Sequence, residues 1–104
     1  MKALGTLYTV LTIAISFTMD VWTGTAFALA PLATTIGGAV VRIASIRGDI
    51  LVGIFVGGGL IGGGWAFGEW MQLRVELLDT QFAAGWWMLA GAAIGFAGGP
   101  EAVV

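Results

Sequence analysis

Uncharged apolar runs alternate with short polar segments along this chain. Residues 3–17 form the first long run, residues 50–68 the second and residues 82–99 the third. At about 1.5 Å per residue, the second run makes a helix of about 28 Å, close to a hydrocarbon thickness of about 30 Å. The pattern therefore predicts membrane helices over residues 50–68 and 82–99.

A polar connection, residues 69–81, separates these two helices and carries four charged side chains: Glu69, Arg74, Glu76 and Asp79. Four tryptophans fall near the loop ends of the predicted helices: Trp65, Trp70, Trp86 and Trp87. Tryptophan favours the boundary between lipid and water, and a hairpin would bring all four rings to the same boundary. The alternative is that these rings fill space between helices. Either way, the pattern predicts an all-α fold built on a helical hairpin.

Residues 31–49 separate apolar from polar positions at helical spacing. The apolar positions are Leu32, Ile36, Val40 and Ile43, and the polar positions are Thr35, Arg42, Ser45 and Asp49. This spacing predicts a short amphipathic helix that lies at the membrane interface or packs on a partner. The alternative is a short membrane span, because residues 25–41 carry no charge.

The first 30 residues have the layout of a secretory signal sequence. Lys2 precedes the apolar run, and two overlapping A-x-A patterns follow it, one ending at Ala28 and one at Ala30. We predict cleavage after Ala28 or Ala30, which leaves a mature chain of residues 31–104 or one two residues longer. The alternative is an uncleaved membrane helix, because Asp20 and Trp22 make the region after the apolar core long.

Residues 53–68 hold eight glycines in sixteen residues. Gly57, Gly59 and Gly62 fit a G-x-G-x-x-G pattern, but no strand–turn–helix unit surrounds them. A phosphate-binding P-loop is excluded too, because Trp65 follows Gly64 where a lysine is needed. In lipid, a helix is enforced despite the glycines, because unsatisfied backbone groups cost several kcal/mol each.

Glycines four residues apart allow helix backbones to approach closely. The candidate packing positions are Gly53, Gly57, Gly58, Gly62, Gly63, Gly64, Gly68, Gly91, Gly95 and Gly99. They place small residues on most of the circumference of the first helix, whereas a single partner needs only one face. We therefore expect an array of identical subunits, with packing inside one heteromeric complex as the alternative.

Composition narrows the function. Of the 104 residues, 59% are apolar and only 10% are charged, which is typical of a membrane protein rather than a soluble domain. Cysteine and histidine are absent, and the net charge is −2. We therefore expect no metal site, no cofactor, no enzymatic activity and no sequence-specific binding of nucleic acid. Residues 82–99 contain no ionisable side chain, which argues against an ion-carrying rotor ring or a charge-based transporter.

The pattern resembles the TrbC-like conjugative pilin family, the major pilus subunits of type IV secretion systems. The resemblance is carried by the A-x-A patterns of residues 26–30, the stretch GGGLIGGGWAFGEW at 57–70, the charged turn, and AGAAIGFAGG at 90–99. It implies that the precursor waits in the bacterial inner membrane as a hairpin with a cytoplasmic loop. The secretion machinery then assembles subunits into an extracellular helical filament that transfers DNA or protein.

The resemblance also implies roles for individual residues. The glycines would be packing positions, and the charged residues of the connection (Glu69, Arg74, Glu76 and Asp79) would line the lumen or remain in the loop. A filament of this family retains phospholipid between subunits, and Arg74 is the candidate contact for a lipid phosphate. The alternative for Arg74 is an ordinary solvated loop charge.

Two arginines oppose this topology. Arg42 and Arg47 precede the first predicted helix, and basic residues tend to stay on the cytoplasmic side, whereas signal cleavage would place this side outside. A chain with spans at residues 3–17 and 25–41 ahead of the hairpin removes the conflict. That arrangement suits a holin-like protein or a small accessory integral membrane subunit.

Overall fold

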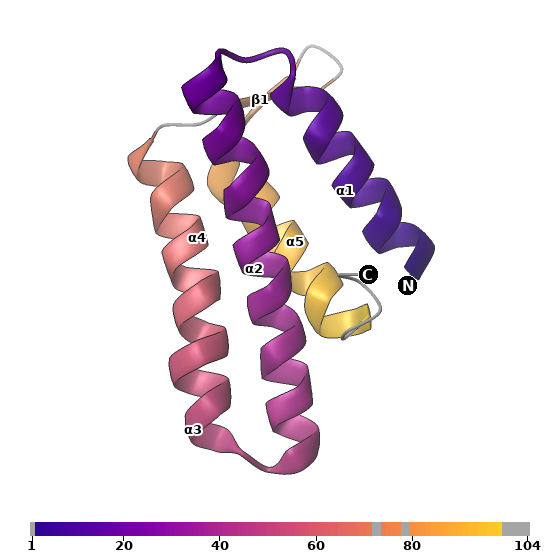
Figure 1. Cartoon of the computed structure of the whole chain (residues 1–104), viewed down its shortest axis with the longest axis vertical. Helices are drawn as coiled ribbons and strands as arrows, with labels where there is room; N and C mark the ends of the chain where they lie inside the picture. Colours follow the sequence, from indigo (N-terminus) through magenta and orange to yellow (C-terminus); the bar gives the residue numbers. More distant parts are fainter. Residues whose placement is uncertain (1, 72–73, 78–79, 99–104) are drawn as a thin grey trace.

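The computed structural model describes residues 2–71, 74–77 and 80–98, with side chains described for residues 3–71 and 85–98. Its elements in chain order are α1 (Lys2–Ser16), α2 (Val21–Arg47), α3 (Ile50–Val52), the π-helical turn η1 (Gly53–Gly57), α4 (Gly58–Trp70), β1 (Arg74–Leu77), β2 (Thr80–Ala83) and α5 (Ala84–Gly98). The molecule measures 42 × 28 × 21 Å (Figure 1). It is predominantly helical, as the hydrophobic pattern predicts.

Helix α2 is the centre of the fold. It contacts α1, α4 and α5, and Figure 1 shows α4 on one side of it, α1 on the other and α5 behind. The segments α3, η1 and α4 follow one another without interruption and form a single rod, Ile50–Trp70, beside α2. The rod begins at the residue predicted for the first membrane helix and extends two residues beyond its predicted end.

The predicted amphipathic helix over residues 31–49 is not a separate element. It is the second half of α2, which starts at Val21 and continues through Pro31. Proline has no backbone N–H to donate within the helix. The hydroxyl groups of Thr34 and Thr35 donate to the Pro31 carbonyl oxygen at 3.0 and 2.7 Å, so the polar side chains after the proline are satisfied within the helix.

The side of α2 that is buried within the chain is its small-residue side. The buried positions are Gly24, Ala26, Phe27, Ala30, Pro31, Thr34, Thr35, Gly37, Gly38, Ala39 and Ala44, so that Phe27 is the one large side chain among them. The predicted apolar positions Leu32, Ile36 and Ile43 are instead exposed at 48%, 36% and 36%. Small residues between helices and large apolar residues outside are typical of helices that pack in lipid.

A glycine turn connects α2 to the rod. Gly48 has a φ of 75°, in the left-handed region that glycine adopts without strain. Its backbone N–H and that of Asp49 both donate to the Ala44 carbonyl oxygen, which satisfies the last turn of α2. The chain therefore reverses within two residues, and the rod runs back along α2.

The predicted polar loop over residues 69–81 was wrong in its secondary structure. Trp70 still belongs to α4, and β1 and β2 form a two-stranded antiparallel ribbon. In its register Val75 lies opposite Phe82 and Arg74 opposite Ala83. The sequence of β1 alternates polar and apolar residues, a period-2 signal for a strand that the charged character of this segment concealed. Helix α5 consequently begins at Ala84, two residues later than predicted.

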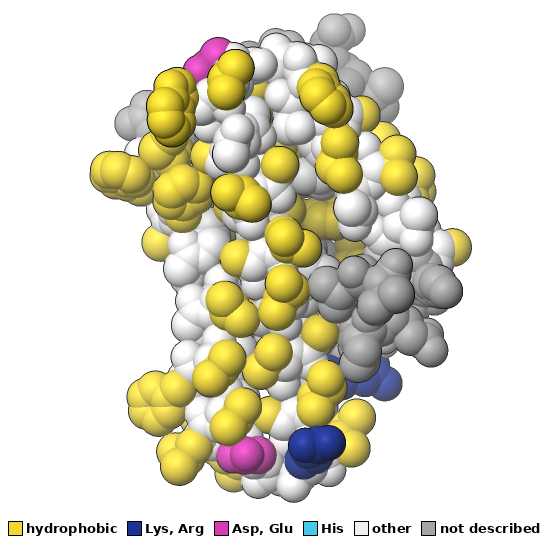
Figure 2. All heavy atoms as spheres, viewed as in Figure 1, with side chains coloured by type: hydrophobic (Ala, Val, Ile, Leu, Met, Phe, Trp, Pro, Cys, Tyr) yellow, Lys and Arg dark blue, Asp and Glu magenta, His cyan; other side chains and the backbone are white. Residues whose placement is uncertain are grey.

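Two helices are long and apolar enough to cross a membrane, judged by length and composition: Val21–Arg47 and Ile50–Trp70. The pair differs from the predicted pair, because α5 is a 15-residue helix in the structure and residues 21–47 form the longer one. On the face drawn in Figure 2, hydrophobic side chains are spread along the length of the molecule, and charged ones lie toward its two ends. On the rod, Leu51, Ile54 and Phe55 are exposed at 68%, 60% and 73%.

Candidate functional site

The rod approaches α2 most closely at two of its glycines. A Cβ atom at Gly57 would lie 2.5 Å from the Cγ2 atom of Val41. A Cβ atom at Gly64 would lie 2.6 Å from the Cγ2 atom of Thr34 and 3.1 Å from the carbonyl oxygen of Ala30. Such distances are shorter than side-chain carbons tolerate, so glycine at both positions allows the two helices to approach as closely as they do.

Helix α5 meets a neighbouring face of α2 in the same way. A Cβ atom at Gly38 would lie 2.8 Å from the amide nitrogen of Phe96 and would overlap the carbonyl oxygen of Ala92. A Cβ atom at Gly95 would overlap the carbonyl oxygen of Thr35. All these neighbours are backbone atoms, so the two helices cannot relieve a clash by turning a side chain.

Four further glycines of the rod are exposed. Among the described residues, and apart from the adjoining backbone of the helix itself, the nearest heavy atom to a Cβ at Gly58 would be 3.9 Å away, and none lies within 4 Å of one at Gly59, Gly62 or Gly63. These four residues, Gly58, Gly59, Gly62 and Gly63, form what we call the open glycine face of α4. A groove of about 310 Å³ between α2 and α4 adjoins it at Gly59 and Gly63.

The other predicted packing glycines are distributed as follows. Gly53 is half-buried with a Cβ position 3.2 Å from Cβ of Ala44, and Gly68 is buried. Gly91 is buried against α1, since a Cβ there would lie 2.6 Å from Oη of Tyr8. Gly99 lies outside the described residues. The structure thus divides the predicted set into glycines that pack within the chain and glycines that do not.

The predicted lumen or loop residues are not brought together by described side chains. Glu69 is exposed near the end of α4. Arg74 and Glu76 lie in β1, where the backbone alone is described, and Asp79 lies outside the described residues. The proposed contact between Arg74 and a lipid phosphate therefore stays a prediction.

Sequence reasoning missed Gly37 and Gly38. A Cβ atom at Gly37 would lie 2.8 Å from the carbonyl oxygen of Gly57, and Gly38 makes the α5 contact described above. The signal was present as small residues four apart, Ala30, Thr34 and Gly38, the spacing that favours close helix packing. It was obscured because the large apolar residues of this segment show helical spacing of their own.

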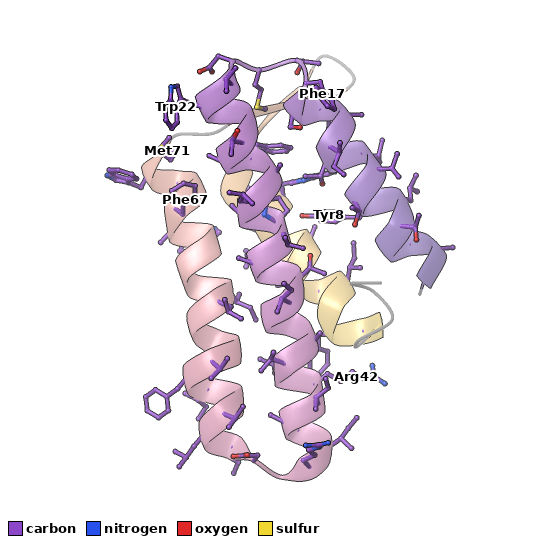
Figure 3. The ribbon with its side chains drawn as sticks, in the orientation of Figure 1. Tyr8, Phe17, Trp22, Arg42, Phe67 and Met71 are labelled. Atoms are coloured by element: carbon purple, nitrogen blue, oxygen red, sulfur yellow. The ribbon has the colours of Figure 1, made fainter. Side chains whose placement is uncertain are left out.

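A hydrogen-bonded network joins α1 to α5. The Tyr8 hydroxyl donates to the carbonyl oxygen of Trp87 at 2.6 Å, and the Trp87 Nε1–H donates to Oγ1 of Thr12 at 2.9 Å. The two rings stack with centroids 4.8 Å apart. Figure 3 shows Tyr8 pointing from α1 toward α5. Residues 79 positions apart in sequence are thereby fixed against each other, which sequence periodicity could not indicate.

Arg42 caps the end of α5. Its Nη1 group donates to the carbonyl oxygens of Phe96 and Ala97, at 3.0 and 2.6 Å. Carbonyls in the last turn of a helix have no partner within it, and a cation there also interacts favourably with the helix dipole. Arg42 therefore has a local role in the fold besides any influence of its charge on membrane topology.

Exposed aromatic side chains gather at one end of the molecule. Figure 3 shows Phe17, Trp22 and Phe67 at this end, together with Met71. Trp70 and Trp86, on either side of the β-ribbon, are exposed at 77% and 70%. Trp87 is instead half-buried against Tyr8, so one of the four predicted boundary tryptophans fills space between helices.

The described side chains offer packing surfaces rather than reactive groups. A groove of about 350 Å³ between α1 and α2 is lined mostly by apolar residues, together with Thr9, Thr12 and Thr35. Within residues 2–71, 74–77 and 80–98, no group of three or more acidic, histidine or cysteine side chains is placed to hold a metal ion. What these surfaces can do is make close helix contacts in an apolar surrounding.

No family model, no curated protein and no solved structure matches this chain.

Proposed function

We propose that this protein is a structural pilin that polymerises into a type IV secretion pilus after its N-terminal segment is removed. The observation that carries the proposal is the open glycine face of α4, Gly58, Gly59, Gly62 and Gly63, where no described residue comes within 3.9 Å of a Cβ position, the backbone of the helix itself aside. The same helix uses Gly57 and Gly64 to pack on α2. One helix therefore presents two small-residue surfaces, of which its own chain covers one.

Physical chemistry favours a protein helix as the cover. Lipid chains are as apolar as a leucine side chain, so helices in a membrane associate through close packing rather than through the hydrophobic effect. Each atom pair in contact contributes about 0.1–0.2 kcal/mol, and a bare glycine face allows many such pairs with a second backbone. Phospholipid would occupy the surfaces that protein leaves free, which agrees with the exposed apolar side chains of the rod.

The first test is microscopy and intact mass of material sheared from the surface of producing cells. We expect filaments whose subunit lacks the first 28 or 30 residues. A sheared subunit that retains Met1–Ala28 would reject a pilin of this type. Filaments are the direct readout, because a membrane subunit that stays in the bilayer leaves none in this fraction.

The second test concerns the open glycine face of α4. Gly62→Leu adds a large side chain to the open glycine face, and because space there is free, the subunit itself should fold normally. We expect filaments to be lost while helix content in detergent is unchanged. Ala90→Leu is the matched control, because Ala90 is an exposed small residue on α5. Normal filaments from the Gly62 variant would contradict the proposal.

A second candidate is a small accessory integral membrane subunit that keeps its N-terminal segment. One observation favours it: Ala28, Ala30 and Pro31, the residues around the predicted cleavage bonds, lie inside the continuous helix α2, and Ala30 and Pro31 are buried. Signal peptidase must reach an accessible backbone, so this conformation has to open before cleavage. Full-length protein in the membrane and no sheared filaments would favour this candidate.

A further inference from the structure

The core of the molecule is built mainly from residues of the predicted signal sequence. Its buried cluster and the residues packed against it are Ile15, Met19, Ala26, Phe27, Ala30, Trp87 and Met88. Five of these seven lie within residues 1–30, and the remaining two, Trp87 and Met88, lie in α5. Phe27 and Met88 are fully buried. The N-terminal segment, residues 1–30, is thus the cover of one face of α5.

That face of α5 consists of Trp87, Met88 and Gly91. Helix α1 contacts both the polar and the apolar groups of this face. Thr12 accepts the hydrogen bond from the Trp87 indole, and Tyr8 stacks on the Trp87 ring and approaches Gly91. The end of the N-terminal segment also reaches α4, because the Ala30 carbonyl oxygen lies 3.1 Å from the Cβ position of Gly64.

Removal of the segment would leave this face of α5 without apolar packing partners and without a hydrogen-bond acceptor. Met88 and the half-buried Trp87 ring would lose the side chains that pack on them. The Trp87 indole N–H would also lose its acceptor, Thr12. In an apolar surrounding an unpaired donor costs several kcal/mol, so lipid chains alone are a poor replacement.

We propose that residues 1–30 mask an assembly surface, and that a second copy of this chain takes their place on α5 after cleavage. This inference rests on the proposed function. The covering element is the open glycine face of α4 in the next subunit. A helix that lacks side chains admits the large Trp87 and Met88 side chains closely, and its bare carbonyl oxygens can accept a second hydrogen bond, from the Trp87 indole.

Such a contact joins two different surfaces, α5 of one copy and α4 of the next. A contact between unlike surfaces repeats from subunit to subunit, and where its rotation does not close a ring it gives an open helical filament. Masking one of the two surfaces keeps the precursor from polymerising before it is processed. The order of events, membrane insertion first and assembly second, then follows from the packing of the precursor.

Ala28 allows masking to be tested in the full chain. It belongs to both A-x-A patterns, so Ala28→Leu should block cleavage at either bond. Ala28 is half-exposed and lines the groove of about 350 Å³ between α1 and α2, which has room for leucine. The matched control is Ala14→Leu, the same change at an exposed position of α1 outside both patterns.

The measurements are intact mass and the fraction of chain in assemblies larger than a monomer, by cross-linking in membranes. We expect wild type and Ala14→Leu to be shortened and assembled. Ala28→Leu should keep all its residues and be at least about tenfold less assembled, which corresponds to about 1.4 kcal/mol of association free energy. An unprocessed Ala28→Leu chain that assembles like wild type overturns the masking and leaves the pilin proposal intact. A wild-type chain that keeps residues 1–28 overturns both.

The pairing of surfaces has its own test, because the chain has no native cysteine. Two versions are produced together, one with Met88→Cys and one with Gly62→Cys, and membranes are oxidised. We expect a disulfide between the two versions, and none when both also carry Ala28→Leu. Ala90→Cys replaces Met88→Cys as the control for random collision. An equal yield from the Ala90 pair would overturn the contact between α5 and α4.

Discussion

The backbone contact between α2 and α5 can be tested with two alanine substitutions that differ only in their surroundings. Gly38 lies against α5, where a Cβ would lie 2.8 Å from the Phe96 nitrogen, whereas at Gly59 no atom of the described residues outside the adjoining helix backbone lies within 4 Å of the Cβ position. Both lie inside helices, so both substitutions gain about 1 kcal/mol of helix propensity. This gain cancels when the two variants are compared with each other.

What remains is the cost of separating two backbones. To restore an ordinary contact of 3.4 Å at Gly38→Ala, α5 must move away by at least about 0.6 Å. A gap of that size forfeits about a quarter of each van der Waals contact along the seam, and overpacking of this kind typically costs about 1–3 kcal/mol. We therefore expect Gly38→Ala to be about 1–3 kcal/mol less stable than Gly59→Ala.

The assay is reversible unfolding of the purified full-length chain in detergent, followed by far-ultraviolet circular dichroism during titration with a denaturing detergent. Each variant is also compared with wild type, because Gly59→Ala alone should be neutral or stabilising. Equal stabilities for the two variants would refute the close approach of α2 and α5. A destabilised Gly59→Ala would show instead that the open glycine face packs within the chain.

Three smaller predictions concern polar side chains. Arg42→Gln should cost about 1–2 kcal/mol and speed hydrogen exchange in the last turn of α5, because a charged donor to two carbonyls is lost. Trp87→Phe and Thr12→Val should each destabilise the precursor by about 1 kcal/mol, and the double variant by less than the sum, in thermal unfolding. Hydrogen bonding by the Thr23 side chain lowers the pKa of Asp20. The ionised Asp20 carboxylate therefore stabilises the fold at pH values above the ordinary carboxyl pKa, and this stabilisation is lost as the pH falls through the lowered pKa. Thr23→Val should raise that pKa toward its usual value, as measured by NMR titration.

The sequence was informative wherever one apolar run corresponds to one helix. The rod Ile50–Trp70 follows directly from an uncharged stretch between Asp49 and Glu69. The sequence was misleading where a local helix-breaking residue lies inside a longer helix. Pro31 suggests that a helix starts near residue 31, but a single proline removes one hydrogen bond, and packing on both flanks maintains α2 across it.

The candidate site was predictable in kind but not in detail. Spacing identifies glycines that permit close approach, but it does not say which of them the chain uses for itself. Gly57 and Gly58 are neighbours in sequence, yet one is buried against Val41 and the other faces outward. That distinction depends on where α2 lies, and α2 was predicted as two pieces. The contact between Tyr8 and Trp87 was beyond sequence reasoning because it joins two helices that are distant in the chain.

The inverted burial of α2 links the membrane environment to assembly. Small residues inside and exposed Leu32 and Ile36 outside leave its helix contacts dependent on backbone proximity rather than on burial of large side chains. The atoms nearest to the Cβ positions of Gly37 and Gly38 lie in η1, α4 and α5, and none of them belongs to residues 1–30. In the proposed assembly, the first 30 residues would leave α5 and a second copy would take their place without rearrangement of α2 around Gly37 and Gly38. In the same proposal Pro31 assists release of the segment, since its missing hydrogen bond weakens α2 next to the predicted cleavage bonds.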